Sequence, residues 1–495
     1  MEQGGTDMTQ RTLTHRSPLV AAAIASLLLA GCLVGPTYHR PQMEPPPQHR
    51  FVEGPAQAES IADTPWWKIF EDAELQALIR EAIANNLDLR DATARVEEAR
   101  ARAGVAKSFL YPELGASVGY ATRQASRVSD PPETTTDTRS FQNWSGGFTL
   151  SWEIDLFGRL RRQNEASFAV YLATNEARRG VLITLVADVA SNYLLLRDLD
   201  LQLEIARWTL QANDEMVAFY RARLQGGVSN RLELDRAVAN RARTAAVIPG
   251  LEQQIAATEN LLSLLLGRPP GTIPRGITLT DQHMPPQVPA GLPAALLERR
   301  PDVVQAEQLL VAANADVGAA KALFFPTINL TGLLGGLSKD ASDLLKPDAA
   351  IWSLGAGLFQ PIFQGGRINQ NYEASKARFD QALAQYQKAA LNAYREVADS
   401  LVAIQKLGQA RLELEQGVEA SRDASKLARS RYDTGLANYL EILNADQQLF
   451  DQELQLAQTR GSELVAFVQL YRALGGGWEQ PPETGTSGKT GATTP

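Results

Sequence analysis

Two long stretches of the chain have the composition of helices and contain no proline. Proline is absent from 133 to 248 and from 362 to 480. The segment from Arg159 to about Leu224 is rich in alanine, leucine, arginine, glutamate and glutamine, which favour helices. At 1.5 Å per residue such a helix would reach on the order of 100 Å, and ordinary globular helices are far shorter. The pattern predicts a coiled coil or a helical tunnel.

Each long helical stretch ends at a glycine. Gly227 and Gly435 suit the left-handed backbone that commonly terminates a helix. We expect returning helices from about 230 to 266 and from about 438 to 474. Pro249 interrupts the first of them, and because proline lacks an N–H and clashes with the preceding turn, we expect a kink or break there.

Four shorter segments alternate apolar and other residues. They are 114–120, 148–154, 328–332 and 352–356. The alternation suits membrane-spanning β-strands, and it suits equally a half-buried sheet in a soluble domain. No segment after the N-terminal leader has the roughly 20 consecutive apolar residues of a transmembrane helix, so any membrane crossing would be made by strands.

The number of strands restricts how they could cross a membrane. An open sheet edge cannot lie in lipid, and small closed barrels begin at about eight strands. Four strands per chain would therefore have to share a barrel between chains. Two chains would give eight strands and three would give twelve, and the strand pattern leaves both open.

The chain contains an internal repeat. Trp144 and Trp352 begin similar segments at an offset of 208 (352 − 144 = 208). The same offset relates RLQGGVSNRLELDRA, which starts at Arg223, to RYDTGLANYLEILNA, which starts at Arg431. Each copy reads as a helix, a pair of strands and a long helical region, which indicates a duplication.

The N-terminus has the pattern of a lipoprotein leader. A basic lead is followed by an apolar run from Pro18 to Ala30, too short for a permanent membrane span. Leu29-Ala30-Gly31-Cys32 then resembles the bacterial lipobox, in which cleavage precedes a lipidated cysteine. Cys32 is the only cysteine of the chain, so an internal disulfide is excluded. Met8, rather than Met1, is a second candidate for the start.

The sequence predicts six segments. They are a signal peptide at 1–31, a proline-rich lipidated tether at 32–65, a first repeat at 66–270, a proline-rich link at 271–293, a second repeat at 294–478 and a disordered tail at 479–495.

Composition and motifs exclude several functions. The formal net charge of −8 argues against a nucleic-acid partner. None of the four histidines has metal-ligand spacing, and neither a phosphate-binding loop nor a nucleophile elbow is present. We therefore expect no enzyme activity, no metal and no cofactor.

Four segments resemble the outer-membrane factor family, which is TolC-like, and most closely its OprM/NodT-type efflux lipoproteins. They are LVGPTYHRP, TPWWKIFEDAELQALIREAIANNLDLRDATARVEEARA, RYDTGLANYLEILNADQQLF and YRALGGGW. The resemblance implies an α+β membrane protein, a homotrimer with a 12-stranded outer-membrane β-barrel, four strands per chain, continuous with a long periplasmic α-helical barrel.

The resemblance also implies a function and partners. The trimer would be the passive export duct of a tripartite efflux system, working with a periplasmic adaptor (membrane fusion protein) and an inner-membrane RND-type pump. Cys32 would carry diacylglycerol and an N-acyl chain in the outer-membrane lipid. A type I secretion duct and a lipid-anchored periplasmic coiled-coil scaffold without a pore are the alternatives. Drugs, metal ions and plant-derived compounds all stay open as cargo.

Family members place a gate at the periplasmic tip of the helices. The resemblance carries the gate arginine and tyrosine to Arg431 and Tyr432, before Gly435, and an acidic position to Glu441. Asn444 stands where family members commonly have a second acid, so an acidic ring at that level is in doubt.

The first copy offers matching gate positions. The resemblance implies Arg223 and Glu233, with Leu224 in place of the tyrosine and Asp235 as an added carboxylate. Rings of acidic side chains favour cations and can be bridged by arginines. The alternative is that these charges form a solvated helix face.

Overall fold

The structure is a computed structural model that describes residues 33–44, 46, 71–124, 140–282 and 296–476. The predicted signal peptide, Cys32 and the predicted tail lie outside these residues. The chain forms two compact units. The first unit takes in Glu97–Leu172, Gln308–Ala384 and the residues up to Arg40, and the second takes in the remainder.

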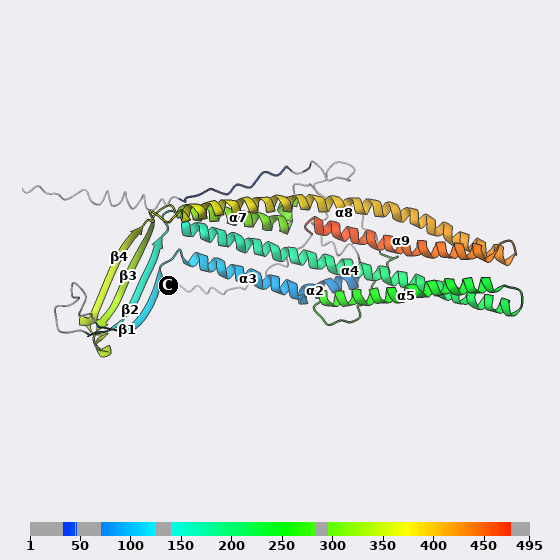
Figure 1. Cartoon of the computed structure of the whole chain (residues 1–495), viewed down its shortest axis with the longest axis horizontal. Coiled ribbons are helices and arrows are strands. Elements are labelled where there is room, and N and C mark those ends of the chain that lie inside the picture. The colour runs from blue at the N-terminus through cyan, green and yellow to red at the C-terminus, as the bar shows by residue number, and fades with distance from the viewer. Residues whose placement is uncertain (1–32, 45, 47–70, 125–139, 283–295, 477–495) are drawn as a thin grey trace, which may run out of the picture. The chain divides into compact units, whose positions relative to one another are not determined.

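The first unit contains one antiparallel sheet of four strands, as the alternating segments predict. The strands are β1 (Glu113–Gln124), β2 (Ser140–Ile154), β3 (Thr327–Ser338) and β4 (Ala350–Phe359). They lie in the order β1-β2-β3-β4, and Figure 1 shows them side by side. The strands of the two repeats therefore meet in one sheet, with β1 and β4 at its edges.

The register gathers the large apolar side chains on one face of the sheet. Residues directly opposite in antiparallel strands share a face, and one such row runs from Ala116 to Phe148, Leu334 and Trp352. Phe148, Leu334 and Trp352 are 57%, 64% and 78% exposed. The neighbouring rows on the other face carry mostly glycine, serine and threonine, as at Ser117, which pairs with glycine. One face of the sheet is thus apolar, and no described residue covers this row.

The four longest helices form two pairs of equal length, one member of each pair in either half of the chain. The two longest have 67 residues each and the two that follow them have 35 each. They are α4 (Arg159–Gln225), α5 (Arg231–Leu265), α8 (Arg367–Asp433) and α9 (Tyr439–Ala473), and the shorter helices are α2 (Ala73–Asn85), α3 (Leu87–Ser108), α6 (Leu296–Arg299) and α7 (Pro301–Ala322). A helix of 67 residues measures about 100 Å at 1.5 Å per residue, so the predicted long helices are confirmed.

Both predicted reversals occur at the expected glycines. Gly227 and Gly435 adopt φ of +69° and +77°, which favours glycine because it has no Cβ. Asn230 and Asn438 then cap α5 and α9, each accepting a hydrogen bond from a backbone N–H of the first helical turn.

Of the kink or break expected at Pro249, the break does not occur, since α5 continues through the proline from Arg231 to Leu265. Leu251 beside the proline is 6% exposed, and Val247 and Ile248 pack against the same apolar cluster. Packing on both sides of the proline holds the helix together and outweighs the lost backbone hydrogen bond.

The main core lies in the second unit around the middle of α4. Val189, Tyr193 and Leu196 are completely buried and pack with residues of α2, α5 and α9. One 18-residue window of α4, with a mean hydropathy of 1.4, is long and apolar enough to cross a membrane by composition alone, yet half of it is buried within the structure. The apolar centre of α4 is accounted for by this core.

Two polar side chains join helices end to end in the second unit. Asn86 accepts from the N–H of Leu89 at the start of α3 (2.9 Å) and donates to the carbonyl of Leu265 at the end of α5 (2.9 Å). Arg300, just before α7, donates to the carbonyl of Ala473 at the end of α9 (2.8 Å). Both are buried, and each satisfies a carbonyl that a helix end leaves without a partner.

The buried carboxyl group of Asp198 makes the stability of this unit depend on pH. Its carboxylate is 5% exposed and accepts from the Gln202 amide at 2.9 Å, and burial raises its pKa from 3.8 to about 6. Because the pKa is higher in the folded state, the stability it contributes is full below pH 3.8 and is lost as the pH rises through about 6.

We therefore expect Asp198→Asn to remove part of the pH dependence of unfolding. A shift from 3.8 to about 6 corresponds to about 3 kcal/mol, so the variant should gain up to that much relative to the wild type between these pH values. Denaturant unfolding of both proteins across this range measures it, with Asp433→Asn, an exposed position on α8, as the control. Parallel curves for Asp198→Asn and the wild type would contradict the prediction.

Candidate functional site

The turn between α8 and α9 brings two of the predicted gate residues together. Arg431 and Glu441 lie 3.7 Å apart (Nε to Oε2), with side chains 50% and 47% exposed. The Arg431 guanidinium also donates to the carbonyl of Leu436 at 3.3 Å. An exposed pair of this kind contributes about 0.2–1 kcal/mol, so it can be exchanged for other contacts at little cost.

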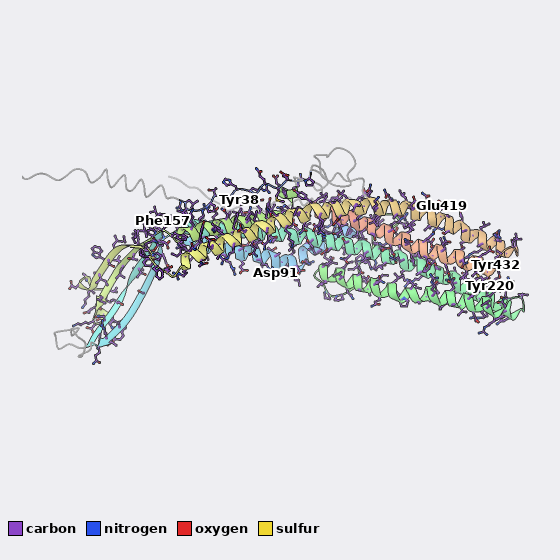
Figure 2. All side chains as sticks on the ribbon, turned by 45° about the horizontal axis from the view of Figure 1, so that its top comes forward. Tyr38, Asp91, Phe157, Tyr220, Glu419 and Tyr432 are labelled. Carbon is purple, nitrogen blue, oxygen red and sulfur yellow. The ribbon has the colours of Figure 1, made fainter. Side chains whose placement is uncertain are left out.

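A cluster of tyrosines supports this turn from inside. Tyr220 of α4 is completely buried, and its ring lies 4.4 Å from that of Tyr439 and 6.2 Å from that of Tyr432 (centroid distances). Tyr220 and Tyr432 are marked in Figure 2 at the ends of α4 and α8. Burial raises the pKa of both Tyr220 and Tyr439, the latter to about 12. These tyrosines are therefore neutral at neutral pH.

Arg223 joins the two turns. Its guanidinium lies 5.6 Å from the ring centre of Tyr432 and 5.5 Å from that of Phe219, within cation–π range. It also donates to the carbonyl of Val228 at 3.4 Å. The predicted residues Arg223 and Tyr432, from different repeats, are thus in contact.

The other predicted gate residues make local contacts or none. The N–H of Glu233 donates to the Asn230 side chain (3.0 Å), and the carboxylate of Glu233 accepts from the Ser229 hydroxyl. Asp235 pairs with Arg231 at 3.1 Å on an exposed face.

Asn444 is exposed, and its side chain makes no hydrogen bond within the described ranges of the chain. The sequence did not single out Tyr220 and Tyr439. Their signal was the position of Tyr220, three residues before Arg223, and of Tyr439, the first residue of α9.

A second site lies in the first unit, at the residues that follow Cys32. The N–H of Val34 donates to the carbonyl of Phe157 at 3.2 Å. The carbonyl of Pro36 accepts from Arg162 and from Asn314, each at 3.1 Å. Arg162 and Asn314 are 3% and 4% exposed. We call these five residues the N-terminal clamp.

Two glycines allow the clamp to form. A Cβ on Gly35 would lie 2.4 Å from the Cα of Gly318, and Gly35 has a φ of +113°. A Cβ on Gly318 would lie 2.8 Å from Nε of Arg162. The N-terminal segment therefore crosses α7 at a point where both residues are glycines and no side chain lies between the two backbones.

We expect Gly35→Ala to displace the clamped segment, because the added methyl group meets backbone that cannot move easily. The initial rate of chymotrypsin cleavage after Tyr38 measures this, and it should rise severalfold. Gly104→Ala is the matched control, since a Cβ there meets nothing within 4 Å. An unchanged cleavage rate in Gly35→Ala would contradict the prediction.

Comparison with known proteins identifies the family of this chain. The sequence model described as Outer membrane efflux protein matches residues 78–268 and 292–476. The chain belongs to the outer membrane efflux protein family. This efflux protein therefore acts at the outer membrane, and its relatives are efflux channels rather than enzymes.

Two relatives and one solved structure illustrate the similarity. The efflux protein is 36% identical over 459 residues to "Cation efflux system protein CusC" of Escherichia coli O6:H1, covering 92% of this chain and 98% of that one. It is 34% identical to "Probable outer membrane lipoprotein SilC" of Salmonella typhimurium, covering 91% and 97%. The solved structure of the outer-membrane channel OprN superimposes with a TM-score of 0.83 at 30% identity, covering 90% and 100%.

Proposed function

We propose that three copies of this efflux protein form one passive export duct through the outer membrane. Each copy would supply four strands to a twelve-stranded barrel. The observation that carries the proposal is the sheet itself, whose apolar face is uncovered and whose edge strands β1 and β4 each have one side without a strand partner among the described residues.

Lipid would cover the apolar face, and neighbouring copies would supply the hydrogen-bond partners of the edge strands. Hydrocarbon covers an apolar face favourably, but it offers no partner to the backbone groups of an edge strand. Pairing β1 of one copy with β4 of the next closes the sheet and leaves no edge. The polar and small residues of the opposite face would then line a passage, as in water-filled membrane barrels.

The long helices would continue the passage into the periplasm and close it at their tips. Threefold symmetry would place three Glu441 carboxylates around one axis, with Arg431 beside each of them. Arg223, Glu233 and Asp235 would form the outer part of the same tip, and the exposed Asn444 would add an uncharged ring. The ring of Glu441 carboxylates would favour cations, and the weak Arg431–Glu441 pair would be the contact that opening breaks.

We assign a periplasmic adaptor and an inner-membrane RND-type pump as partners, because relatives such as CusC are named as components of efflux systems. The lipid on Cys32 would be a secondary anchor, which the name of the lipoprotein SilC supports. Residues 66–270 and 294–478 would be the two repeats of the duct. A lipid-anchored scaffold without a pore would leave the apolar face of the sheet in water, which disfavours that alternative.

Purified full-length protein tests the duct directly. We expect a species of three chains that dissociates only on heating in detergent, and discrete conductance steps in planar bilayers after the tips are opened by variants. The measurement is single-channel recording beside an electrophoretic comparison of heated and unheated samples. A monomer that leaves the membrane without detergent, and that gives no conductance, would overturn the proposal.

The gate assignment gives a separate prediction. Glu441→Gln and Arg431→Ala each remove one partner of the tip pair, so both should raise the resting conductance of the channel severalfold. Glu419→Gln, which removes an exposed carboxylate from α8, is the control and should leave it unchanged. If both tip variants conduct like the wild type, Arg431 and Glu441 are part of a solvated helix face and not of a gate.

A further inference from the structure

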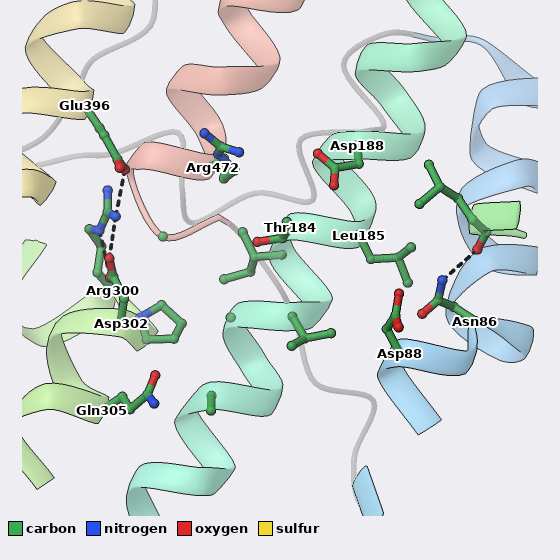
Figure 3. A pocket seen from close by; sticks show the side chains of 17 residues that line it. Asn86, Asp88, Thr184, Leu185, Asp188, Arg300, Asp302, Gln305, Glu396 and Arg472 are labelled. Atoms are coloured by element: carbon green, nitrogen blue, oxygen red, sulfur yellow. Dashed lines mark hydrogen bonds and ion pairs between the residues drawn. The ribbon is translucent and has the colours of Figure 1, made fainter. Parts of the chain in front are cut away.

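The second unit contains a cavity of about 710 Å³ beside α4. Figure 3 shows α4 passing between the two end-to-end helix junctions made by Asn86 and Arg300. Apolar side chains form part of the wall, among them Val181, Ile183 and Leu185 of α4. The volume lies within the roughly 300–1,000 Å³ of sites that bind small organic molecules.

Asp188 and Arg472 face each other across this cavity without pairing, and the exposed Asp88 of α3 is a further carboxylate in its lining. Asp188 projects from α4 and Arg472 from the end of α9 (Figure 3). Neither the Asp188 carboxylate nor the Arg472 guanidinium makes a hydrogen bond or ion pair with any residue in the described part of the chain. Burial raises the pKa of Asp188, although the charge of Arg472 acts in the opposite direction. The two groups are thus near enough to interact and too far apart to pair.

The other arginine of the cavity is already fully used. Arg300 binds the carboxylates of Asp302 and Glu396 at 2.7 and 2.8 Å, in addition to the carbonyl that it caps. The positive charge of Arg300 is therefore already neutralised by two carboxylates. Arg472 is the cation that remains available, and Asp188 is the partly buried anion opposite it.

We propose that this cavity binds a small zwitterion that carries an ammonium group, a carboxylate and an apolar body. The ammonium group would pair with Asp188 and the carboxylate with Arg472, while the apolar body rests on the α4 wall. Charge-assisted hydrogen bonds of this kind are the strong ones. The site goes beyond the proposed duct, because it is built within one chain and does not depend on a pore.

The arrangement selects against molecules with one charge. A simple cation would pair with Asp188 and bring a like charge toward Arg472. A simple anion would pair with Arg472 and approach Asp188 in the same way. Only a zwitterion satisfies both groups together, and leaving a partly buried charge without a partner is unfavourable.

Three probes with one fluorophore test the proposal. Nε-dansyl-lysine carries an α-ammonium and an α-carboxylate, dansyl-cadaverine carries only an ammonium group, and dansyl-glycine carries only a carboxylate. Each is titrated into the full-length protein in lipid nanodiscs, with empty nanodiscs as the blank. We expect saturable, blue-shifted emission from Nε-dansyl-lysine at one probe per chain, with affinity at least tenfold above that of either other probe.

Single variants on two different helices complete the test. Asp188→Asn and Arg472→Gln should each weaken Nε-dansyl-lysine binding at least tenfold and abolish its preference over one of the singly charged probes. Asp214→Asn, an exposed position on α4, is the control, and circular dichroism verifies the fold of each variant. No saturable binding, equal affinity for the three probes, or unchanged affinity in both variants would overturn the proposal. Conductance is recorded separately, so a failure of this site leaves the duct proposal standing.

Discussion

Two features of the sheet place the main constraint on the structure. Its edge strands need hydrogen-bond partners, and its apolar face needs to be covered. In water the exposed row of Phe148, Leu334 and Trp352 would be unfavourable. In lipid the outer sides of β1 and β4, which have no strand partner among the described residues, would be unfavourable. A single copy satisfies neither condition. Both would be satisfied by the proposed assembly, in which further copies pair with the edges and lipid covers the face.

The long helices reverse direction once in each half of the chain, and both reversals use the same local features. Each long helix ends at a glycine with positive φ, and each returning helix begins at an asparagine cap. Asn86 and Arg300 differ in chemistry, yet each donates to the last carbonyl of a returning helix. The two halves thus keep the same geometry where it is set by backbone groups. They differ in side-chain chemistry at the tips, where Tyr432 of one half meets Arg223 of the other.

Local features of the sequence predict most of the fold. Gly227, Gly435 and the alternating strands succeed because the signal and the structure lie within a few residues of each other. Pro249 fails as a predicted break because distant packing holds α5 together. The Tyr220–Tyr439 contact and the hold of Arg162 on Pro36 join residues more than 100 positions apart. Hydrophobic period and turn chemistry carry no information on such pairs, so only the folded chain reveals them.

The most direct test of the central claim joins the two sheet edges covalently. Cys32 is the only native cysteine, so Ala116→Cys in β1 can be combined with cysteine at each position of β4 in turn. Oxidation in isolated outer membranes, read by denaturing electrophoresis, reports pairing between copies. The account predicts that at least one register gives linked species that end at three chains. No linked species in any register, or a ladder that continues beyond three, would contradict it.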